Sequence, residues 1–421
     1  MDNFTLSLRD TSQRIDTALF EAYKKSHRSA LAQIIHTPPL YQNDTGWMDI
    51  NKWASPKRIA TLISLSTELA TRVDTLVVIG IGGSNNAARA TLSALQKKSS
   101  INVIFAGNTL SSYETEQILE SLKGKEYAIQ VIAKNFETLE PGVAFRILRK
   151  DLHQRYGHHA HRYIYITGSR GSLTEKLADQ EGYTFLTFPS DIGGRYSALS
   201  DVGLFPMAAG GVDIQSLVHG AQIMKDYLYT CPTLLNPAFT YATARNYLNE
   251  QHFTCEMLSF FEPRLQGFSL WWKQLLAESE GKEGKGLFPL SSCFSEDLHS
   301  IGQYIQEGEN FIFETFIKIY NDGSSPILIE KDGVDDHFDY LNGMSLSHIN
   351  QVAEEATLAA HSHRFPCIEI NIPVLNEEAI GTLFYFFEFS IYLSAQILGV
   401  NPFDQPGVEA YKKRMFQGLE R

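Results

Sequence analysis

The chain has 421 residues, too many for one ordinary compact core, so two or three domains of roughly 100 to 200 residues each are expected. A formal net charge of −12 excludes the broad basic face that nucleic acid or an anionic membrane requires. We therefore expect no nucleic-acid or membrane partner, and an anionic substrate would need a local positive site built from few residues.

The four cysteines are widely spaced and form no CxxC pair, which predicts neither a disulfide framework nor a zinc site. The N-terminal stretch "MDNFTLSLRD" lacks the basic and apolar regions of a signal peptide. We therefore expect a cytoplasmic protein with reduced thiols.

Residues 1–70 are polar with helical periodicity and predict an N-terminal helical segment. The pattern then changes to short, β-rich apolar runs, each followed by a helix-like stretch. Such alternation predicts a parallel sheet wrapped in helices, so residues 71–210 are expected to form a first α/β domain. The predicted strands are 75–80, 101–107, 127–134 and 162–168.

Long helices are predicted after the glycine-rich connector at 191–211, and strand-like runs then return. We expect a second α/β domain over residues 211–400 and a terminal helix in residues 401–421. The predicted helices are 213–230 and 236–250, and the predicted strands are 254–261, 310–319 and 367–373.

One apolar stretch, residues 379–400, is long enough to span a membrane. Glu388 at its middle would cost about 2.5 to 3.5 kcal/mol on insertion scales. The stretch is therefore predicted to be a buried core helix.

A glycine-rich turn, "GIGGS", joins the first predicted strand to a helix and contains Gly80, Gly82, Gly83 and Ser84. Glycines let the backbone approach a ligand, and a helix N-terminus favours an anion. A dinucleotide fingerprint would need glycine or alanine where Asn85 stands, and an acid after the next strand, where the chain reads "AGN". A dehydrogenase is excluded on both grounds, and a tight turn without a ligand is the alternative.

Two further loops carry cations. The third predicted strand ends in "AKNFET", where Lys134, Asn135 and Thr138 could cap a helix or hold an oxyanion; a solvated strand end is the alternative. In "GGRYS", Arg195 follows Gly194, and an arginine so flanked can stabilise an oxyanion or form a surface ion pair.

An apolar helical run becomes charged and glycine-rich in "WWKQLLAESEGK", residues 271–282. Gln274 and Glu278 are four residues apart and hence on one helix face. Glu278 stands where the apolar run ends, so it is the candidate general base. Glu280 and Glu283 lie among glycines and are predicted to be solvated.

Histidines give a weaker signal. His299 in "DLHS" stands near the start of a predicted helix and, taken alone, is an ordinary packed or surface histidine. His361 and His363 have a spacing that could ligate a metal, yet no companion carboxylate motif supports it, so no metal is assigned.

These motifs occur in the same order as in glucose-6-phosphate isomerases, and the chain resembles the shorter bacterial form of that family. The resemblance runs from "GIGGS" through "GGRYS", "ESEGK" and "DLHS" to "NPFDQPGVEAYKK", and covers nearly all of the chain beyond about residue 70. It implies two sugar-isomerase (SIS-type) αβα sandwich domains with parallel sheets, flanked by N-terminal and C-terminal helical extensions. It also implies a homodimer whose site lies between the domains and is completed by the second subunit.

The implied reaction is the reversible aldose–ketose isomerisation of glucose 6-phosphate and fructose 6-phosphate through an enediolate, in glycolysis and gluconeogenesis, with no metal or organic cofactor. By resemblance, Glu278 moves the proton between C2 and C1, and Arg195 stabilises the enediolate. His299, supplied by the partner subunit, and Lys412 assist ring opening. The resemblance assigns substrate or phosphate contacts to Gly83, Ser84, Lys134, Asn135, Thr138, Gly194, Gln274 and Gln405.

One loop departs from the family pattern, which usually reads like SKSGTT or SKTFTT. Ala133 and Asn135 replace hydroxyl residues here, and Glu137 adds a negative charge. Each hydrogen bond lost to a charged group costs about 1.5 to 3 kcal/mol. Two alternatives therefore stay open, namely a sugar-phosphate-binding regulator without turnover and an isomerase for a different phosphosugar, such as a pentose or an amino sugar.

Overall fold

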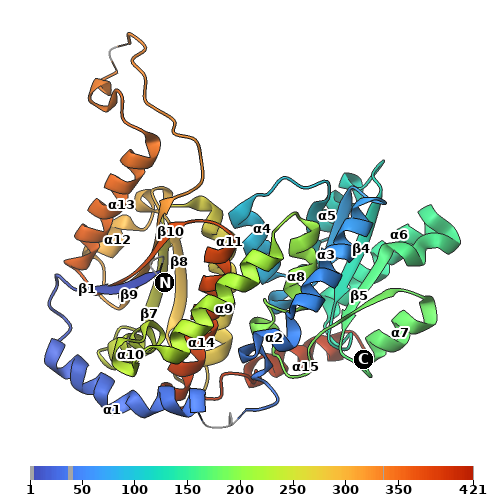
Figure 1. The fold of residues 1–421 in the computed structure, drawn as a ribbon, viewed down its shortest axis with the longest axis horizontal. Coiled ribbons are helices and arrows are strands. Elements are labelled where there is room, and N and C mark those ends of the chain that lie inside the picture. The colour runs from blue at the N-terminus through green and yellow to red at the C-terminus, as the bar shows by residue number, and fades with distance from the viewer. Residues whose placement is uncertain (1–3, 37–40, 335, 421) are drawn as a thin grey trace.

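The structure is a computed structural model that describes residues 4–36, 41–334 and 336–420. Two five-stranded sheets lie side by side, and helices cover the faces of both and fill the space between them (Figure 1). This is the α/β architecture that the alternating pattern predicts. The division at residues 70, 210 and 400 stays a prediction.

The first sheet has the strand order β3-β2-β4-β5-β6 and is parallel throughout. Its central strands β2 and β4 are fully buried, which is why their sequences are continuous apolar runs. The strands are β2 Thr75–Ile79, β3 Asn102–Ala106, β4 Tyr127–Ile132, β5 Ile164–Gly168 and β6 Thr184–Thr187. The helices around it are α3 Pro56–Ala70, α4 Asn86–Leu95, α5 Ser112–Ser121, α6 Leu139–Tyr156, α7 Leu173–Glu181 and α8 Asp201–Ala209.

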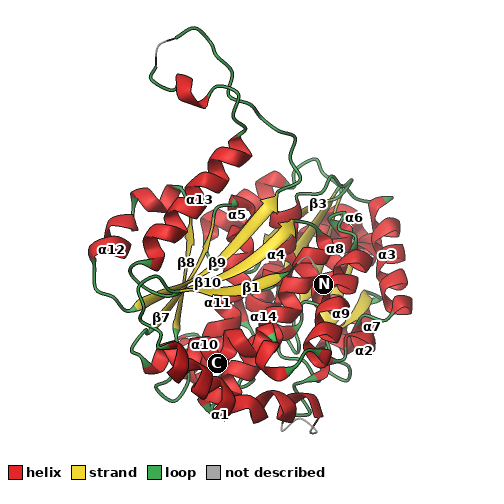
Figure 2. Cartoon of the chain, turned by 60° about the vertical axis from the view of Figure 1, so that its left-hand side comes forward, coloured by secondary structure: helices red, strands yellow, loops and turns green. Residues whose placement is uncertain are grey.

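The second sheet has the order β1-β10-β9-β7-β8, in which β1 alone runs antiparallel to its neighbour. Figure 2 shows its strands as a twisted fan. The strands are β1 Thr5–Arg9, β7 Cys255–Phe260, β8 Phe288–Cys293, β9 Ile312–Asn321 and β10 Cys367–Val374. The remaining helices are α1 Thr17–His36, α2 Ile50–Trp53, α9 Ile214–Thr230, α10 Pro237–Glu250, α11 Gln266–Glu280, α12 Gly302–Glu307, α13 Leu346–Ser362, α14 Glu377–Leu398 and α15 Glu409–Gly418.

The two sheets share one topology. In each, the second strand along the chain is added on one side of the first and the later strands on the other side, giving β3-β2-β4-β5 and β8-β7-β9-β10. β1 occupies the edge position that β6 takes in the first sheet. The expectation that residues 1–70 form a helical segment is therefore wrong for residues 5–9, because an N-terminal strand finds its hydrogen-bond partners in β10, far along the chain.

Sequence patterns also missed β6 and β8. β6 has four residues, too few to show a period. β8 is an edge strand that begins with Phe288, whose exposed fraction is 70%, followed by Pro289. Proline is tolerated there because the outer side of an edge strand needs no ladder hydrogen bond.

Helix α14 is the helix among the described residues that is long and apolar enough to cross a membrane, and 83% of its apolar window is buried inside the protein. Glu388 at its centre is 1% exposed, and burial holds the pKa of this carboxyl well above its ordinary value. Burial therefore favours the neutral form of this carboxyl, which suits an apolar core. The prediction of a buried core helix is confirmed for this segment.

Packing between helices positions the site. α11 lies against α4 and against α14, and α9 packs along α14 (Figure 1). One continuous hydrophobic core runs from β2 through these helices into the second sheet, while a smaller core lies on the other face of the first sheet under α6. The C-terminal end of α11 is thereby fixed beside the loops of the first sheet.

Candidate active site

The loops after β2 and β4 begin at the same edge of the first sheet, because these strands are adjacent and parallel. The loop after β2 leads into α4, and its two inner glycines are required by close packing. Gly82 has φ +56°, and a Cβ on it would lie 2.7 Å from the Gln274 amide nitrogen. A Cβ on Gly83 would lie 2.1 Å from the backbone of Gly194. The glycines predicted to approach a ligand thus approach the protein's own Gln274 and the "GGRYS" loop.

The loop after β4 holds Lys134 against that same "GGRYS" region. Its ammonium donates to the carbonyl of Ile192 at 2.8 Å and lies 5.0 Å from the centre of the Phe188 ring. Burial lowers the pKa of Lys134, and the nearby carboxylates of Asp44 and Asp191 partly oppose that shift. Lys134 is therefore a half-buried cation beside the glycine loops.

The remaining phosphate-loop candidates lie near the surface. Asn135 and Thr138 are exposed, and Ser84 is half-buried at the start of α4. Thr138 is the N-cap residue of α6, yet its side chain accepts no capping hydrogen bond. Its hydroxyl is therefore not used by the helix.

Arg195 is the most firmly held group of the site, with 2% of its side chain exposed. Its Nη2 donates to the carbonyls of Pro402 at 2.5 Å and Asp404 at 3.1 Å, and its Nε donates to Ser279 Oγ at 3.1 Å. The remaining terminal nitrogen, Nη1, donates to Glu278 Oε2 at 3.0 Å. The guanidinium is thus fixed with one edge toward the carboxylate.

Glu278 lies in the last turn of α11 with 29% of its side chain exposed, so it is both held and accessible. Gln274, one turn earlier on the same face, donates from Nε2 to Glu278 Oε1 at 3.1 Å. Gln405 donates from Nε2 to Glu278 Oε2 at 2.8 Å. Three predicted residues from separate parts of the chain, Arg195, Gln274 and Gln405, therefore converge on the predicted base.

The amide of Gln274 is oriented by a residue that sequence reasoning missed. Asn86, the first residue of α4, donates from Nδ2 to Gln274 Oε1 at 2.9 Å, which leaves the nitrogen of Gln274 facing Glu278. Its position two residues after the "GIGGS" loop was the only signal. Asn86 connects the start of α4 to the helix that carries the base.

The prediction that Glu280 is solvated is wrong. Glu280 is 2% exposed and accepts two hydrogen bonds from Arg245, at 2.7 and 2.8 Å. The reason is helical geometry: α11 continues to Glu280, and residues two apart on a helix point to opposite faces. Glu283 lies in the following loop with 65% of its side chain exposed, as predicted.

The last segment of the chain returns to the site. Residues 401–405 pass over the end of α11 and lead through a short turn, Pro406–Val408, into α15, which carries Lys412 and lies at the bottom of Figure 1. Lys412 is half-buried. Lys412 is therefore connected to Gln405 by one turn and the start of a helix.

His299 is not joined to this group within the chain. It is exposed at the end of the turn Glu296–His299, which Asp297 anchors by accepting from Cys293 N at 2.8 Å. In the described part of the chain, no hydrogen bond or ion pair links His299 to Glu278 or Arg195. The next helix, α12, lies at the outer flank of the second domain in Figure 1, away from α15.

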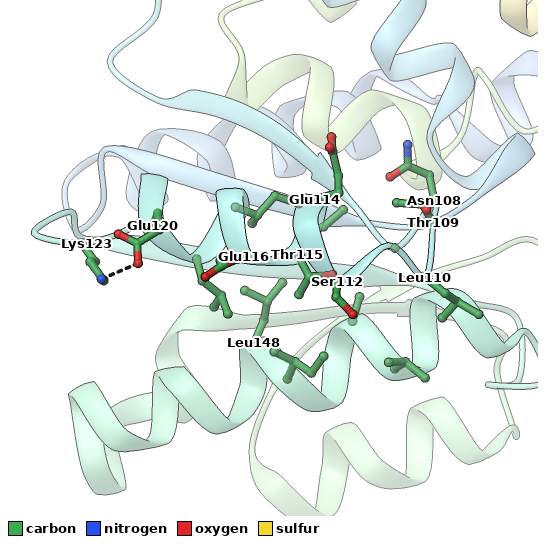
Figure 3. Close-up of a pocket in the computed structure, with 17 residues that line it drawn as sticks. Asn108, Thr109, Leu110, Ser112, Glu114, Thr115, Glu116, Glu120, Lys123 and Leu148 are labelled. Carbon is green, nitrogen blue, oxygen red and sulfur yellow. Dashed lines mark hydrogen bonds and ion pairs between the residues drawn. The ribbon is translucent and has the colours of Figure 1, made fainter.

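A separate pocket of about 700 Å³ lies between α5 and α6 (Figure 3). Its lining is largely apolar and includes Leu110, Val143 and Ile147, and it contains none of the predicted site residues. Among residues 4–36, 41–334 and 336–420, no group of three or more His, Cys, Asp or Glu side chains could hold a metal ion. The convergent groups around Glu278 are therefore the best candidate for a chemical site.

A carboxylate 3.0 Å from a fixed guanidinium suits proton transfer next to a carbonyl. Such a carbon acid needs a positioned base and a cation beside the oxyanion that develops when the proton leaves. Lys134 and the N-terminus of α4 are local positive groups in a chain of negative net charge, and groups of this kind suit an anion.

Comparison with known proteins gives a consistent result. Residues 66–418 match the family model described as phosphoglucose isomerase. A glucose-6-phosphate isomerase of Staphylococcus epidermidis is 43% identical over 395 residues, which cover 91% of this chain and 89% of the relative. One from Bacillus thuringiensis is 43% identical over 417 residues, covering 95% of this chain and 91% of the relative.

Two solved structures have the same fold. A glucose-6-phosphate isomerase from Chlamydia trachomatis superposes with a TM-score of 0.85 at 20% identity, covering 100% of this chain and 89% of that one. A hypothetical protein from Thermus thermophilus superposes with a TM-score of 0.88 at 22% identity, covering 99% of this chain and 100% of that one. The predicted fold class is confirmed.

Proposed function

This chain belongs to the phosphoglucose isomerase family, and we propose that it interconverts glucose 6-phosphate and fructose 6-phosphate with Glu278 as the base. It is an aldose–ketose isomerase. The observation that carries the assignment of the base is the convergence of Arg195, Gln274 and Gln405 on its two carboxylate oxygens.

The proposed proton transfer uses the groups in contact. Glu278 removes the proton from C2 of the open-chain aldose, the electron pair forms the C1–C2 double bond, and the carbonyl oxygen O1 becomes an enediolate oxygen. The proton of the C2 hydroxyl then passes to O1, so that the negative charge moves to O2. The same carboxyl returns its proton to C1 while the O2 electron pair forms the C2 carbonyl, which yields the ketose. General base catalysis supplies roughly 10² to 10⁴ in rate, and a fixed oxyanion donor such as Arg195 a further 10² or more.

The sugar is proposed to open before that transfer, with Lys412 and the partner subunit's His299 moving protons at the ring oxygen and the C1 hydroxyl. Gln274 and Gln405 hold the base and contact the substrate. No metal or organic cofactor enters any of these steps.

The phosphate is proposed to lie at the N-terminus of α4, between the loops after β2 and β4. Gly83, Ser84 and Gly194 line one side, and Lys134 supplies the charge. Asn135 and Thr138 have exposed side chains that are able to turn toward an anion. Glu137 and Thr138 both line a groove along α6 together with Arg146 and Arg149.

An assay that couples fructose 6-phosphate turnover to glucose 6-phosphate detection tests the function. We expect turnover by the full chain, with pentose and amino-sugar phosphates turned over far more slowly. Binding of fructose 6-phosphate without turnover would support a regulator instead. Faster turnover of a pentose or amino-sugar phosphate would assign a different substrate to the altered "AKNFET" loop.

A homodimer is proposed because His299 is exposed and stands apart from the other catalytic candidates. The excursion between β9 and α13, described over residues 322–334 and 336–345, supports it, since this arm projects from the second domain (Figures 1 and 2). Exposed apolar groups on such an arm mark an interaction surface. Those with exposed fractions of 53% to 68% are Ile327, Leu328, Val334, Phe338 and Tyr340.

Mixing two inactive variants tests whether His299 crosses the interface. His299→Ala and Glu278→Gln chains, unfolded together and refolded, should recover about one quarter of wild-type activity, because half of the dimers then carry one intact site of two. Each variant refolded alone should stay inactive. An active monomer in light scattering, or no recovery on mixing, would contradict the arrangement.

Cytoplasmic placement is also proposed. The four cysteines are free, and Cys255 and Cys367 are buried. Burial raises the pKa of both thiols, so they are suited to remain protonated and unreactive.

A further inference from the structure

A second buried cation lies beside the site. Lys282 stands four residues beyond Glu278, just after α11, with 8% of its side chain exposed. Its ammonium forms an ion pair with Asp404 Oδ1 at 2.8 Å and donates to the carbonyl of Asn401. Both partners belong to the segment that returns the end of the chain to the site.

The same short segment is held from its other side by Arg195. Arg195 Nη2 donates hydrogen bonds to the carbonyls of Pro402 and Asp404. Lys282 donates to the carbonyl of Asn401 and forms an ion pair with the carboxylate of Asp404. Two cations thus clamp four consecutive residues, 401–404, that belong to no helix or strand. The next residue is Gln405, which donates to Glu278.

Lys282 also pairs with a carboxylate that stands close to Arg195. Asp404 presents this carboxylate next to the backbone carbonyl that Arg195 already binds. An ammonium with three donors can hold the carbonyl and the carboxylate at once.

We propose that Lys282 is a positioning residue that latches residues 401–405 onto the end of α11. The latch holds Gln405 on the base and sets the start of α15, which carries Lys412. This inference rests on the proposed function for its kinetic consequence only.

The test uses full-length Lys282→Met, with Lys285→Met as a matched control. Lys285 is three residues further on, has 43% of its side chain exposed and donates to Leu398 at 3.2 Å, outside the latched segment. We expect Lys282→Met to lower kcat roughly 10- to 100-fold with a smaller change in KM, since misplacement of about 1 Å suffices for such a loss. Lys285→Met should behave as wild type.

Hydrogen exchange supplies a readout independent of turnover. In Lys282→Met, backbone amides of residues 401–408 should exchange faster, while those of β7 and β9 keep their protection. Asp404→Ala removes the carboxylate partner of Lys282 at a more exposed position. It should reproduce both the lower kcat and the faster exchange, even if Lys282→Met folds poorly. Combining Lys282→Met with Gln405→Ala should add little to the kinetic loss of either change, because both break one latch.

Unchanged exchange in residues 401–408 of both Lys282→Met and Asp404→Ala would overturn the latch, as would wild-type kcat in a folded Lys282→Met. An equal loss of kcat in Lys285→Met would mean that removing any positive charge from this loop has the same effect, and this would also contradict the latch. If the wild-type chain itself failed to turn over fructose 6-phosphate, the proposed function would fail, and the exchange measurement would still decide the latch.

Discussion

Replacing Glu278 by glutamine is expected to lower kcat by roughly 10² to 10⁴, the range that a positioned general base supplies. The amide has the shape of the carboxylate, so the protein should keep its fold. Arg195 would lose one of its four partners and retain Ser279, Pro402 and Asp404. The free energy of unfolding should therefore change little, as measured by urea denaturation alongside the coupled assay.

Glu280→Gln is the matched control, because it makes the same chemical change two residues along the same helix. It should weaken a buried contact to Arg245 and leave a chemically complete site. The result that would contradict the assignment is a large loss of turnover in a stable Glu280→Gln protein together with near-normal turnover in Glu278→Gln.

Replacing Arg245 by methionine is expected to cost about 3 to 5 kcal/mol of stability, because it leaves buried carboxylates without a counter-charge. Arg245 is fully buried and binds Glu256 at 2.5 Å and Glu280 at 2.7 Å. The midpoint of urea unfolding should fall, with the slope unchanged if the folded state stays compact.

A triple variant, in which Arg245→Met is combined with Glu256→Gln and Glu280→Gln, provides the control. Removing the stranded charges should recover part of the loss. Exposed ion pairs contribute less than about 1 kcal/mol to the free energy of unfolding. A loss that small for Arg245→Met alone would therefore contradict the expectation for a buried cluster.

Arg245 and Glu278, the residues changed in these two predictions, are linked through the last turn of α11. Arg245 joins α10 to β7 through Glu256 and to the end of α11 through Glu280. It thereby fixes the rotation of the last turn of α11, and Glu278 on the opposite face of that turn is pointed at Arg195. The sequence "ESE" thus holds one glutamate for stability and one for chemistry.

Much of the fold follows from the sequence alone. The buried strands β2, β4, β7 and β9 are recognisable because a central parallel strand must be apolar on both faces. The long helices α9, α10 and α14 follow from their apolar periodicity and length. The strands that escaped prediction, β1, β6 and β8, are edge strands, whose hydrogen-bond partners lie on one side only and whose sequences need not be continuously apolar.

The candidate site divides in a similar way. Local order along the chain marks Gln274 and Glu278 as neighbours, because their spacing of four is a property of the helix itself. Arg195, Gln405 and Lys412 were predicted as site residues only because the order of the motifs resembles that of the family. The meeting of Arg195 and Gln405 at the end of α11 depends on contacts between segments more than 80 residues apart in sequence.

The sequence by itself therefore determined the class of the buried strands and of the long helices, together with the residue types available for proton transfer, because period and spacing are local properties of the backbone. Only the tertiary structure decided that Gly83 packs on Gly194, that Glu280 is buried and that Lys282 holds the returning segment. Each of these depends on which distant surface lies within a few ångströms, and that is a property of the packed chain rather than of any local spacing.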